Sequence, residues 1–188
     1  YQMNSILELS KLNYQNRTLN MNKINVKLLF EDLYHIFKAT MDNKGLLFHI
    51  THQKEFTFES DSSIIKQILT NLISNAIKFT DHGSISIETS LITIDKTNKL
   101  HISITDTGIG IDTDQQISVF EPFYQVGNAA RNEDKGFGLG LSIVNSMAYK
   151  LAIELSLESS LGKGTCFVLQ LPSCEPKDNP METETKSS

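Results

Sequence analysis

The stretch SSIIKQILTNLISNAIKF, residues 62–79, decides how the chain folds, because it is the most regular amphipathic helix in the sequence. Asp61 precedes it as a good N-cap, and the run contains no Gly or Pro. At about 100° per residue, one broad apolar arc contains Ile65, Ile68, Leu69, Leu72, Ile73, Ala76 and Ile77. A narrow polar stripe lies almost opposite and contains Gln67, Asn71, Asn75 and Lys78. We expect the arc to lie on a core and the stripe to face away from it.

The patterns on both sides of this helix predict an α/β fold. Alternating or short apolar runs predict strands at 23–26, 46–51, 56–59, 84–94, 100–105, 154–158 and 165–171. Helical spacing predicts two further helices at 28–43 and 139–151, the first of them ended by Asn43-Lys44-Gly45.

The two ends of the chain differ from its middle. Residues up to about 15 place apolar side chains at helical intervals without an N-cap, which indicates either a helix cut from something longer or a frayed surface helix. An Asn-rich linker follows, through about residue 22. From Pro172 onward the chain holds three of its four prolines, many charges and almost no apolar residues, so we expect a disordered tail or linker.

Composition limits the classes of function. With 188 residues and 39% hydrophobic content, the chain is long enough for one buried core. A net charge of −5 without a Lys/Arg cluster argues against nucleic acid as a partner. No apolar run approaches the roughly 20 residues of a membrane-spanning helix, and no signal peptide pattern is present, so we expect an intracellular location. Cys166 and Cys174 lack zinc or redox spacing and are expected to be reduced thiols without a special role.

The polar stripe Asn71-x-x-x-Asn75-x-x-Lys78 has two interpretations. It could be a solvated helix face, which is the better reading of this motif alone. Alternatively, neutral amide oxygens could complete the coordination of a Mg²⁺ that is bound to phosphates, with the lysine as a nearby point charge.

Two glycine-rich segments follow, each with a plain and a functional interpretation. Asp106-x-Gly108-x-Gly110 ends a predicted strand and is either a turn or a buried carboxylate that accepts a hydrogen bond from the exocyclic amine of adenine. Gly136-x-Gly138-x-Gly140 opens a predicted helix and is either a flexible turn or a phosphate site at a helix N-terminus. The polar loop before it, with Arg131 and Lys135, is either an ordinary surface loop or a lid over a triphosphate.

In this order the motifs resemble the catalytic ATP-binding domain of sensor histidine kinases, in the GHKL superfamily with its Bergerat fold. Residues 67–80 resemble the N box of that family and residues 106–111 its G1 box. Phe120-Glu121-Pro122-Phe123 is similar to the F box, and residues 136–141 to the G2 box. The closing Gly162-Lys163-Gly164-Thr165 matches as well, so the resemblance runs from about residue 22 to 172.

The resemblance implies an α/β two-layer sandwich, in which about three helices cover a mixed, mostly antiparallel sheet. It divides the chain into 1–21, the end of a dimerisation and phosphotransfer helix with its linker, 22–172, the catalytic domain, and 173–188, the tail. Its implied cofactors are ATP and Mg²⁺. Asn71, Asn75 and Lys78 would be catalytic, with Asn75 as the metal ligand. The implied nucleotide-binding residues are Asp106, Gly108, Gly110, Phe123, Arg131, Lys135, Gly136, Gly138, Leu139 and Gly140.

The resemblance also implies partners and a location. The γ-phosphoryl group would pass to a histidine on a helix pair of the same protein, which would be a homodimer at full length, and then to a response regulator or receiver domain. The location would be cytoplasmic, or the cytosolic part of a membrane-anchored sensor. None of the five histidines here has the following Glu and Pro of the family's acceptor segment, so the acceptor is expected outside this segment.

Several positions bear on which reaction takes place. The hydrolytic relatives carry Glu four residues before the magnesium Asn, where this chain has Asn71; an amide cannot deprotonate water, so kinase is favoured over ATPase. Gln125, Phe137 and the Ala152-Ile153 pair depart from the family pattern of Arg, a small hydroxyl residue and a Gly pair. They leave open a degenerate domain that senses nucleotide or docks on another kinase without phosphotransfer.

Overall fold

A computed structural model describes residues 18–52, 56–94, 97–126, 138–171 and 175–176. Its main sheet has the strand order β2-β4-β5-β7-β6. The strands are β2 (Leu47–His52), β4 (Ser84–Ile94), β5 (Thr97–Asp106), β7 (Gly164–Leu171) and β6 (Glu154–Ser160). β2 runs parallel to β4, and the other neighbours are antiparallel. The predicted mixed, mostly antiparallel sheet is confirmed.

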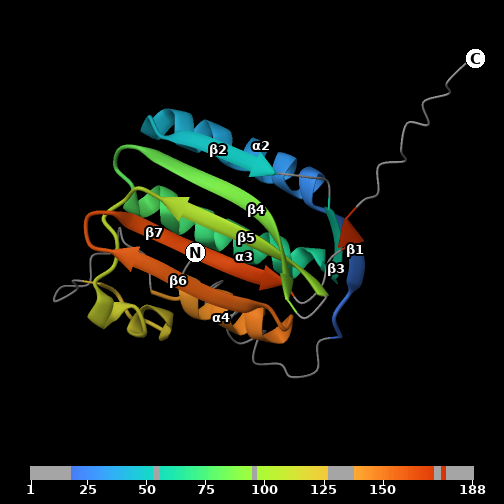
Figure 1. Cartoon of the computed structure of the whole chain (residues 1–188). Coiled ribbons are helices and arrows are strands. Elements are labelled where there is room, and N and C mark those ends of the chain that lie inside the picture. The colour runs from blue at the N-terminus through green and yellow to red at the C-terminus, as the bar shows by residue number, and fades with distance from the viewer. Residues whose placement is uncertain (1–17, 53–55, 95–96, 127–137, 172–174, 177–188) are drawn as a thin grey trace, which may run out of the picture.

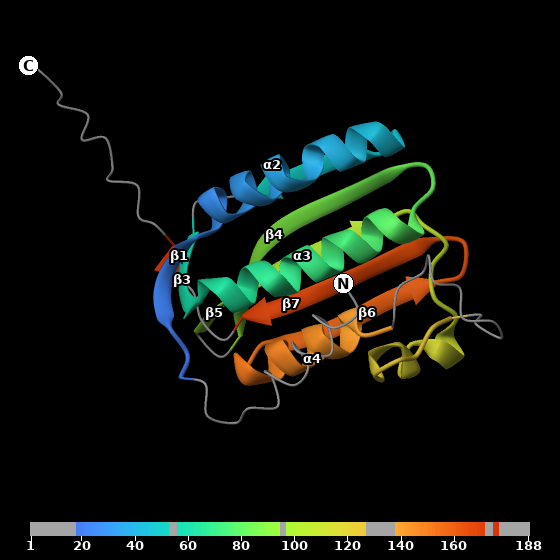
Figure 2. The same ribbon diagram turned by 180° about the vertical axis from the view of Figure 1, so that it is seen from behind.

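Three α-helices of the described residues lie on one face of this sheet, as Figures 1 and 2 show from opposite sides. They are α2 (Val26–Lys44), α3 (Ser62–Phe79) and α4 (Gly140–Lys150). Two 3-10 turns, η1 (Thr113–Gln115) and η2 (Ser118–Phe120), follow β5. This is the two-layer α/β sandwich that the sequence predicted. None of the described helices is long and apolar enough to cross a membrane.

A second, small sheet was not anticipated. It has the order β1-β3-β8, with β1 (Met21–Asn25), β3 (Phe56–Asp61) and β8 (Glu175–Pro176). Glu175 and Pro176, which the sequence analysis assigned to the tail, pair with Thr57 and Phe56. Backbone pairing along a strand edge needs no apolar side chain, so composition carried no signal for it. The proposed N-terminal helix stub lies outside the described residues.

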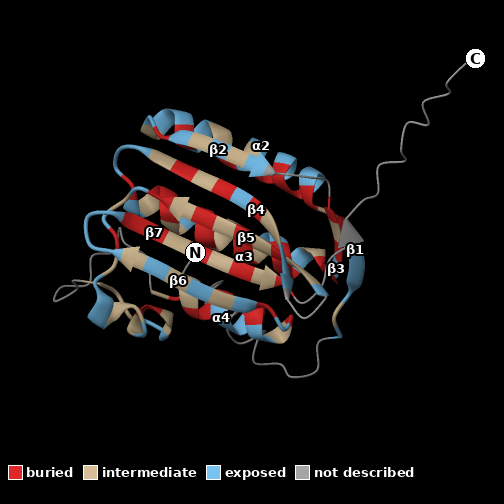
Figure 3. Cartoon of the chain, viewed as in Figure 1, coloured by how far each residue is buried: buried red, intermediate tan, exposed pale blue. Residues whose placement is uncertain are grey.

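The core forms where α3 lies on the sheet. The whole apolar arc of α3 is buried, together with Ile85 and Ile87 of β4 and Ile102 and Ile104 of β5. Figure 3 shows buried residues alternating with less buried ones along the central strands, as expected for strands with one covered face. The predicted strand and helix positions from residue 84 to 171 are confirmed within a few residues.

The start of α3 is fixed by the predicted N-cap. The Asp61 carboxylate accepts hydrogen bonds from the backbone N–H groups of Ser63 and Ile64, and also from that of Asn20 on the approach to β1. Burial acts to raise the pKa of Asp61, but a hydrogen bond from the Ser63 hydroxyl, together with these backbone hydrogen bonds, outweighs it and the pKa is lowered. The carboxylate therefore stays ionised at the positive end of the helix, and the rotation of α3 is set from its first turn.

Candidate functional site

The polar stripe of α3 faces the start of α4. Asn71 and Asn75 are both half-buried. A Cβ atom built on Gly140 would lie 3.7 Å from Asn71 Oδ1, and 3.6 and 3.8 Å from the amide nitrogen and oxygen of Asn75. The stripe does face away from the apolar core, but what it meets is the glycine turn that opens the next helix. The predicted N-box and G2-box residues are thus brought together.

The amide of Asn71 is already oriented. Its Nδ2 donates a hydrogen bond to the carbonyl of Gln67 at 3.0 Å, one turn earlier in α3. The amide oxygen is therefore directed to the opposite side, toward Gly140. A neutral oxygen held in this way suits a hard cation such as Mg²⁺.

The N-terminus of α4 has backbone donors and no side-chain cap. Its N-cap residue is the buried Leu139, which makes no capping hydrogen bond with its side chain. The first N–H groups of a helix have no intrahelical partner, and they carry the positive end of the helix dipole. The amides of α3 and the donors of α4 therefore face the same region, and this arrangement suits a metal-bound phosphate group.

Lys78 lies in the last turn of α3, three residues beyond Asn75. Its ammonium nitrogen lies 4.9 Å above the centre of the Phe79 ring. Next in the chain, the carbonyl of Phe79 accepts a hydrogen bond from Ile109 N at 3.1 Å. The end of α3 is thus joined directly to the predicted G1 loop.

Asp106 forms the other end of the candidate site. Its side chain is 6% exposed, and Oδ1 accepts a hydrogen bond from Gly108 N at 2.8 Å. Burial raises its pKa, although hydrogen bonds from the backbone of Gly108 and Thr165 act in the opposite direction. This bonding fixes one carboxylate oxygen as an acceptor and sets the direction of the other.

Two glycines make the surroundings of Asp106 possible. A Cβ on Gly108 would lie 2.3 Å from the Phe79 carbonyl oxygen, and one on Gly164 would lie 1.9 Å from the Asp106 carbonyl oxygen. Gly110 is also tightly held, with a φ of +68° and the Ser160 carbonyl oxygen 2.0 Å from a Cβ position. Glycine is required here because the backbone segments touch.

Sequence reasoning assigned no role to the hydroxyl groups that surround Asp106. Thr80, fully buried, lies near enough to lower the pKa of Asp106, yet its hydroxyl completes no hydrogen bond with a protein group in the described part of the chain. Ser159 Oγ accepts from Ile111 N at 2.8 Å and lies 3.1 Å from Thr165 Oγ1. Thr80 and Thr165 both lie inside the recognised motifs, and this position was the signal in the sequence that could have pointed to them as site residues.

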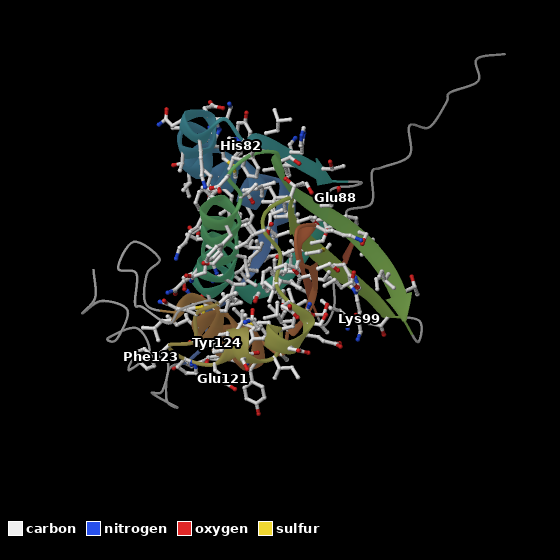
Figure 4. The ribbon with its side chains drawn as sticks, turned by 90° about the vertical axis from the view of Figure 1, so that its left-hand side faces the viewer. His82, Glu88, Lys99, Glu121, Phe123 and Tyr124 are labelled. Carbon is white, nitrogen blue, oxygen red and sulfur yellow. The ribbon has the colours of Figure 1, made fainter. Side chains whose placement is uncertain are left out.

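The F-box residue Phe123 lies beside the glycine turn. Its backbone N–H donates to the carbonyl of Gly138 at 2.9 Å, and both residues have positive φ angles. Figure 4 shows Glu121, Phe123 and Tyr124 near α4, at the end of the molecule away from His82. The Phe123 side chain is exposed. The predicted contributors Arg131, Lys135 and Gly136 lie outside the described residues, as does Phe137.

The residues present fit a magnesium nucleotide. The amide oxygens of Asn71 and Asn75 lie 3.7 and 3.8 Å from the position that a Cβ atom on Gly140 would take. The uncapped start of α4 adds donors for phosphate oxygens. The buried Asp106 carboxylate can accept a hydrogen bond from an amino group of a base. One helix, α3, carries both ends, because its middle bears the amides and its last residue contacts the G1 loop.

Known proteins resemble this chain in sequence. A family model described as histidine kinase-, DNA gyrase B- and HSP90-like ATPase matches residues 60–175. The autoinducer 2 sensor kinase/phosphatase LuxQ of Vibrio cholerae is 38% identical over 172 residues, which is 90% of this chain and 20% of that protein. The sensor protein EvgS of Escherichia coli K12 is 32% identical over 170 residues, 89% of this chain and 14% of that protein. The chain therefore spans a fifth or less of these two relatives.

Solved structures agree with the sequence relatives. Full-length ShkA, crystallised in complex with AMPPNP, superposes with a TM-score of 0.80 at 25% identity and covers 95% of this chain and 36% of that one. The catalytic domain of histidine kinase ThkA in a nucleotide-free form gives a TM-score of 0.69 at 25% identity, over 82% of this chain and 96% of that one. On these grounds the chain belongs to the histidine kinase-, DNA gyrase B- and HSP90-like ATPase family, and within it to the catalytic domains of sensor histidine kinases.

Proposed function

We propose that this catalytic domain binds Mg²⁺-ATP and transfers the γ-phosphoryl group to a histidine that lies outside this segment, in a two-component sensor kinase. The observation that carries the proposal is the approach of Asn71 and Asn75 to Gly140 at the uncapped N-terminus of α4. Polar amides opposite free helix donors suit a bound polyphosphate. LuxQ is a sensor kinase/phosphatase by name, and ShkA was crystallised with AMPPNP, an ATP analogue.

Each end of the site has its own task in this proposal. Asp106 accepts a hydrogen bond from the amino group of adenine. Asn75 supplies the amide oxygen for Mg²⁺, and Asn71 and Lys78 contact the phosphates. When bound, Mg²⁺ would neutralise phosphate charge. The nucleotide is lined by the glycines of the G1 loop, by those of the turn before α4, and by Leu139 and Phe123. Arg131, Lys135 and Gly136 are the remaining residues of the proposed binding site.

Transfer to an external acceptor is favoured over rapid hydrolysis because of Asn71. Its amide donates a hydrogen bond to the Gln67 carbonyl and cannot take a proton from water. The acceptor is proposed to lie on a helix pair of the same protein, which would be a homodimer, with a response regulator or receiver domain as the next partner. The proposed catalytic unit is 22–172, in the cytoplasm.

A fluorescent ATP analogue titrated into this chain, with and without Mg²⁺, tests the binding step. We expect saturable binding that Mg²⁺ strengthens, and no labelling of this chain alone by γ-labelled ATP. Addition of the phosphoacceptor helix pair of the same protein should restore labelling. Binding without any transfer to the added helix pair would favour the degenerate, nucleotide-sensing alternative, and absent binding would exclude both.

A further inference from the structure

Lys44, the last residue of α2, reaches the end of α3. Its Nζ donates hydrogen bonds to the carbonyl of Ile77 at 2.6 Å and to that of Lys78 at 3.4 Å. The Asp81 carboxylate lies 3.7 Å from the same nitrogen. The Lys44 side chain is only 32% exposed. It therefore joins two helices that are separate in sequence.

The end of α3 needs such a partner. The last four carbonyls of an α-helix have no intrahelical donor, and they carry the negative end of the helix dipole. α2 ends in a left-handed glycine, Gly45, whose N–H caps the carbonyls of Met41 and Asp42. α3 instead ends at Thr80 in an extended conformation, with φ −112° and ψ 110°. The Lys44 ammonium supplies donors and a positive charge where the backbone of α3 makes no left-handed turn.

Lys44 is itself held in place on its own side. Leu46 N donates to the Met41 carbonyl at 3.0 Å, and Leu47 N donates to the Gly83 carbonyl at 2.9 Å. The chain that leaves α2 is thus fastened to the loop that follows α3. Because the backbone around Lys44 is fixed by these hydrogen bonds, its side chain can restrain the last turn of α3.

The turn that Lys44 holds is the one that bears Lys78, which the proposed function places at the phosphates. We infer that Lys44 is a positioning residue for the phosphate end: by holding the carbonyls of Ile77 and Lys78, it sets where the Lys78 ammonium lies. This inference rests on the proposed ATP site. In the proposed site Lys44 does not contact the nucleotide, and it acts only through Lys78.

A charge-removing variant, Lys44→Met, tests this. ATP affinity should fall about three- to tenfold, the range for losing a partly buried cation at a helix C-terminus. Affinity for adenosine, which has no phosphates, should stay the same. Lys44→Arg should restore ATP binding. The matched control is Lys38→Met, which removes the exposed ion pair with Asp42 on the same helix and should change neither affinity. All titrations are made well below the unfolding midpoint of each variant, so that a loss of stability cannot lower the folded fraction.

The route through Lys78 is tested by a double-mutant cycle. Lys44→Met combined with Lys78→Met should bind ATP no more weakly than Lys78→Met alone. Additive losses, equal losses for adenosine and ATP, or unchanged ATP affinity in Lys44→Met would each overturn the inference. If the unmodified chain failed to bind ATP, the proposed function itself would be refuted, and this result is separate from those outcomes.

Discussion

The proposed adenine end and the proposed phosphate end of the candidate site are built differently. At the adenine end, Asp106, Thr80 and Thr165 are all buried. At the phosphate end, Asn71, Asn75 and Lys78 are all partly exposed. The Asp106 carboxylate, which we propose reads the base, is therefore fixed by the fold before any ligand arrives, because burying it requires hydrogen bonds from its surroundings.

The phosphate end can remain partly exposed because its groups are neutral amides and a lysine that water solvates well. Its geometry depends on two helix ends, the start of α4 and the last turn of α3. In the proposed site, the group that reads the base is buried and fixed by the fold, whereas the groups that meet the phosphates are partly exposed. Steric changes at the first end should damage fold and binding together, and changes at the second should mainly affect binding.

Gly108→Ala should break this contrast most severely. Its new Cβ would lie 2.3 Å from the Phe79 carbonyl oxygen and 2.9 Å from Asp106 Oδ1, so the G1 loop must move away from α3. We expect a stability loss of about 1–3 kcal/mol, as for overpacking of a tight site, and at least a tenfold loss of adenosine affinity. Chemical denaturation and adenosine titration measure the two effects. Gly162→Ala has no atom within 4 Å of its Cβ but strains a φ of +76°, so it should lose stability and keep its adenosine affinity. A loss of adenosine affinity as large as that of Gly108→Ala would contradict the steric account.

Asp106→Asn should weaken nucleotide binding by about 1–3 kcal/mol, the cost of a mispaired buried polar group. The pKa of Asp106 is raised by burial, so its protonation begins at a higher pH than for an ordinary Asp. A proton on the carboxyl would oppose the adenine amino group, and adenosine affinity should fall as pH falls through that pKa. The Asn variant, titrated over the same pH range, should lack this component.

The pH dependence of folding stability should have the opposite sign to that of adenosine affinity. Since the folded-state pKa of Asp106 is above the unfolded one, protonation favours the folded state. The unliganded chain should therefore gain stability relative to Asp106→Asn as pH falls toward the unfolded pKa, and lose that advantage as pH rises through the folded pKa. Denaturation at several pH values checks this; parallel curves for both chains would show that Asp106 is not perturbed.

Asn75→Ala sharpens the contrast from the phosphate side. It should lower ATP affinity in Mg²⁺ by about tenfold, the lower range for a lost metal contact, and leave ATP affinity in EDTA nearly unchanged. Stability should change little, because the side chain is half-exposed. Ser74→Ala, on the exposed side of the same helix, serves as the control. A full Mg²⁺ response in Asn75→Ala would remove this residue from the metal site.

Thr80→Val should change stability and adenosine affinity in opposite directions. It removes a buried hydroxyl that has no hydrogen-bond partner in the described part of the unliganded chain, so stability should rise by about 0.5–1 kcal/mol. Adenosine affinity should fall, because Thr80 is one of the groups that act to lower the pKa of Asp106 and so favour its ionised form. Thr89→Val removes a buried hydroxyl of β4 for which the described residues offer no hydrogen-bond partner, and it should gain stability without a change in adenosine affinity. Equal adenosine affinities in the two variants would deny Thr80 a role at the site.

Periodicity was sufficient to predict most of the helices and strands, whereas the mixed, mostly antiparallel main sheet was implied by the family resemblance. The arc from Ile65 to Ile77 showed which side of α3 is buried, because a long helix with one apolar face has a single way to lie on a sheet. It could not show what the polar stripe meets. Asn71 and Asn75 contact the Gly140 turn, which is 65 residues further along the chain than Asn75, and only the recognised order of motifs linked these segments.

Other parts of the site left no readable pattern. Lys44 looked like an ordinary charged residue before a C-cap glycine, since its contact with the Ile77 carbonyl is a long-range one. The strand at Glu175–Pro176 pairs through backbone alone. The hydroxyl of Thr80 becomes notable only once its burial next to Asp106 is known. These features depend on tertiary contacts, which local propensity does not encode.

Ala152→Gly should have the smallest effect and touch neither end of the site. Ile153 N donates to the Ala148 carbonyl, and Ala152 N to that of Tyr149, which is the Schellman pattern at the end of α4. Ala152 has a φ of +54°, a left-handed conformation that glycine adopts without steric cost.

The sequence departure noted at this position is therefore a strained cap. Glycine should stabilise the chain by about 0.5–1 kcal/mol in denaturation experiments, with ATP and adenosine affinities unchanged. Ala39→Gly, in the exposed interior of α2, should shift stability the other way by a similar amount, since glycine there only loosens a regular helix. If Ala152→Gly changed nucleotide affinity, the far end of α4 would be coupled to the phosphate end through the helix, and the contrast would have to include the whole of α4.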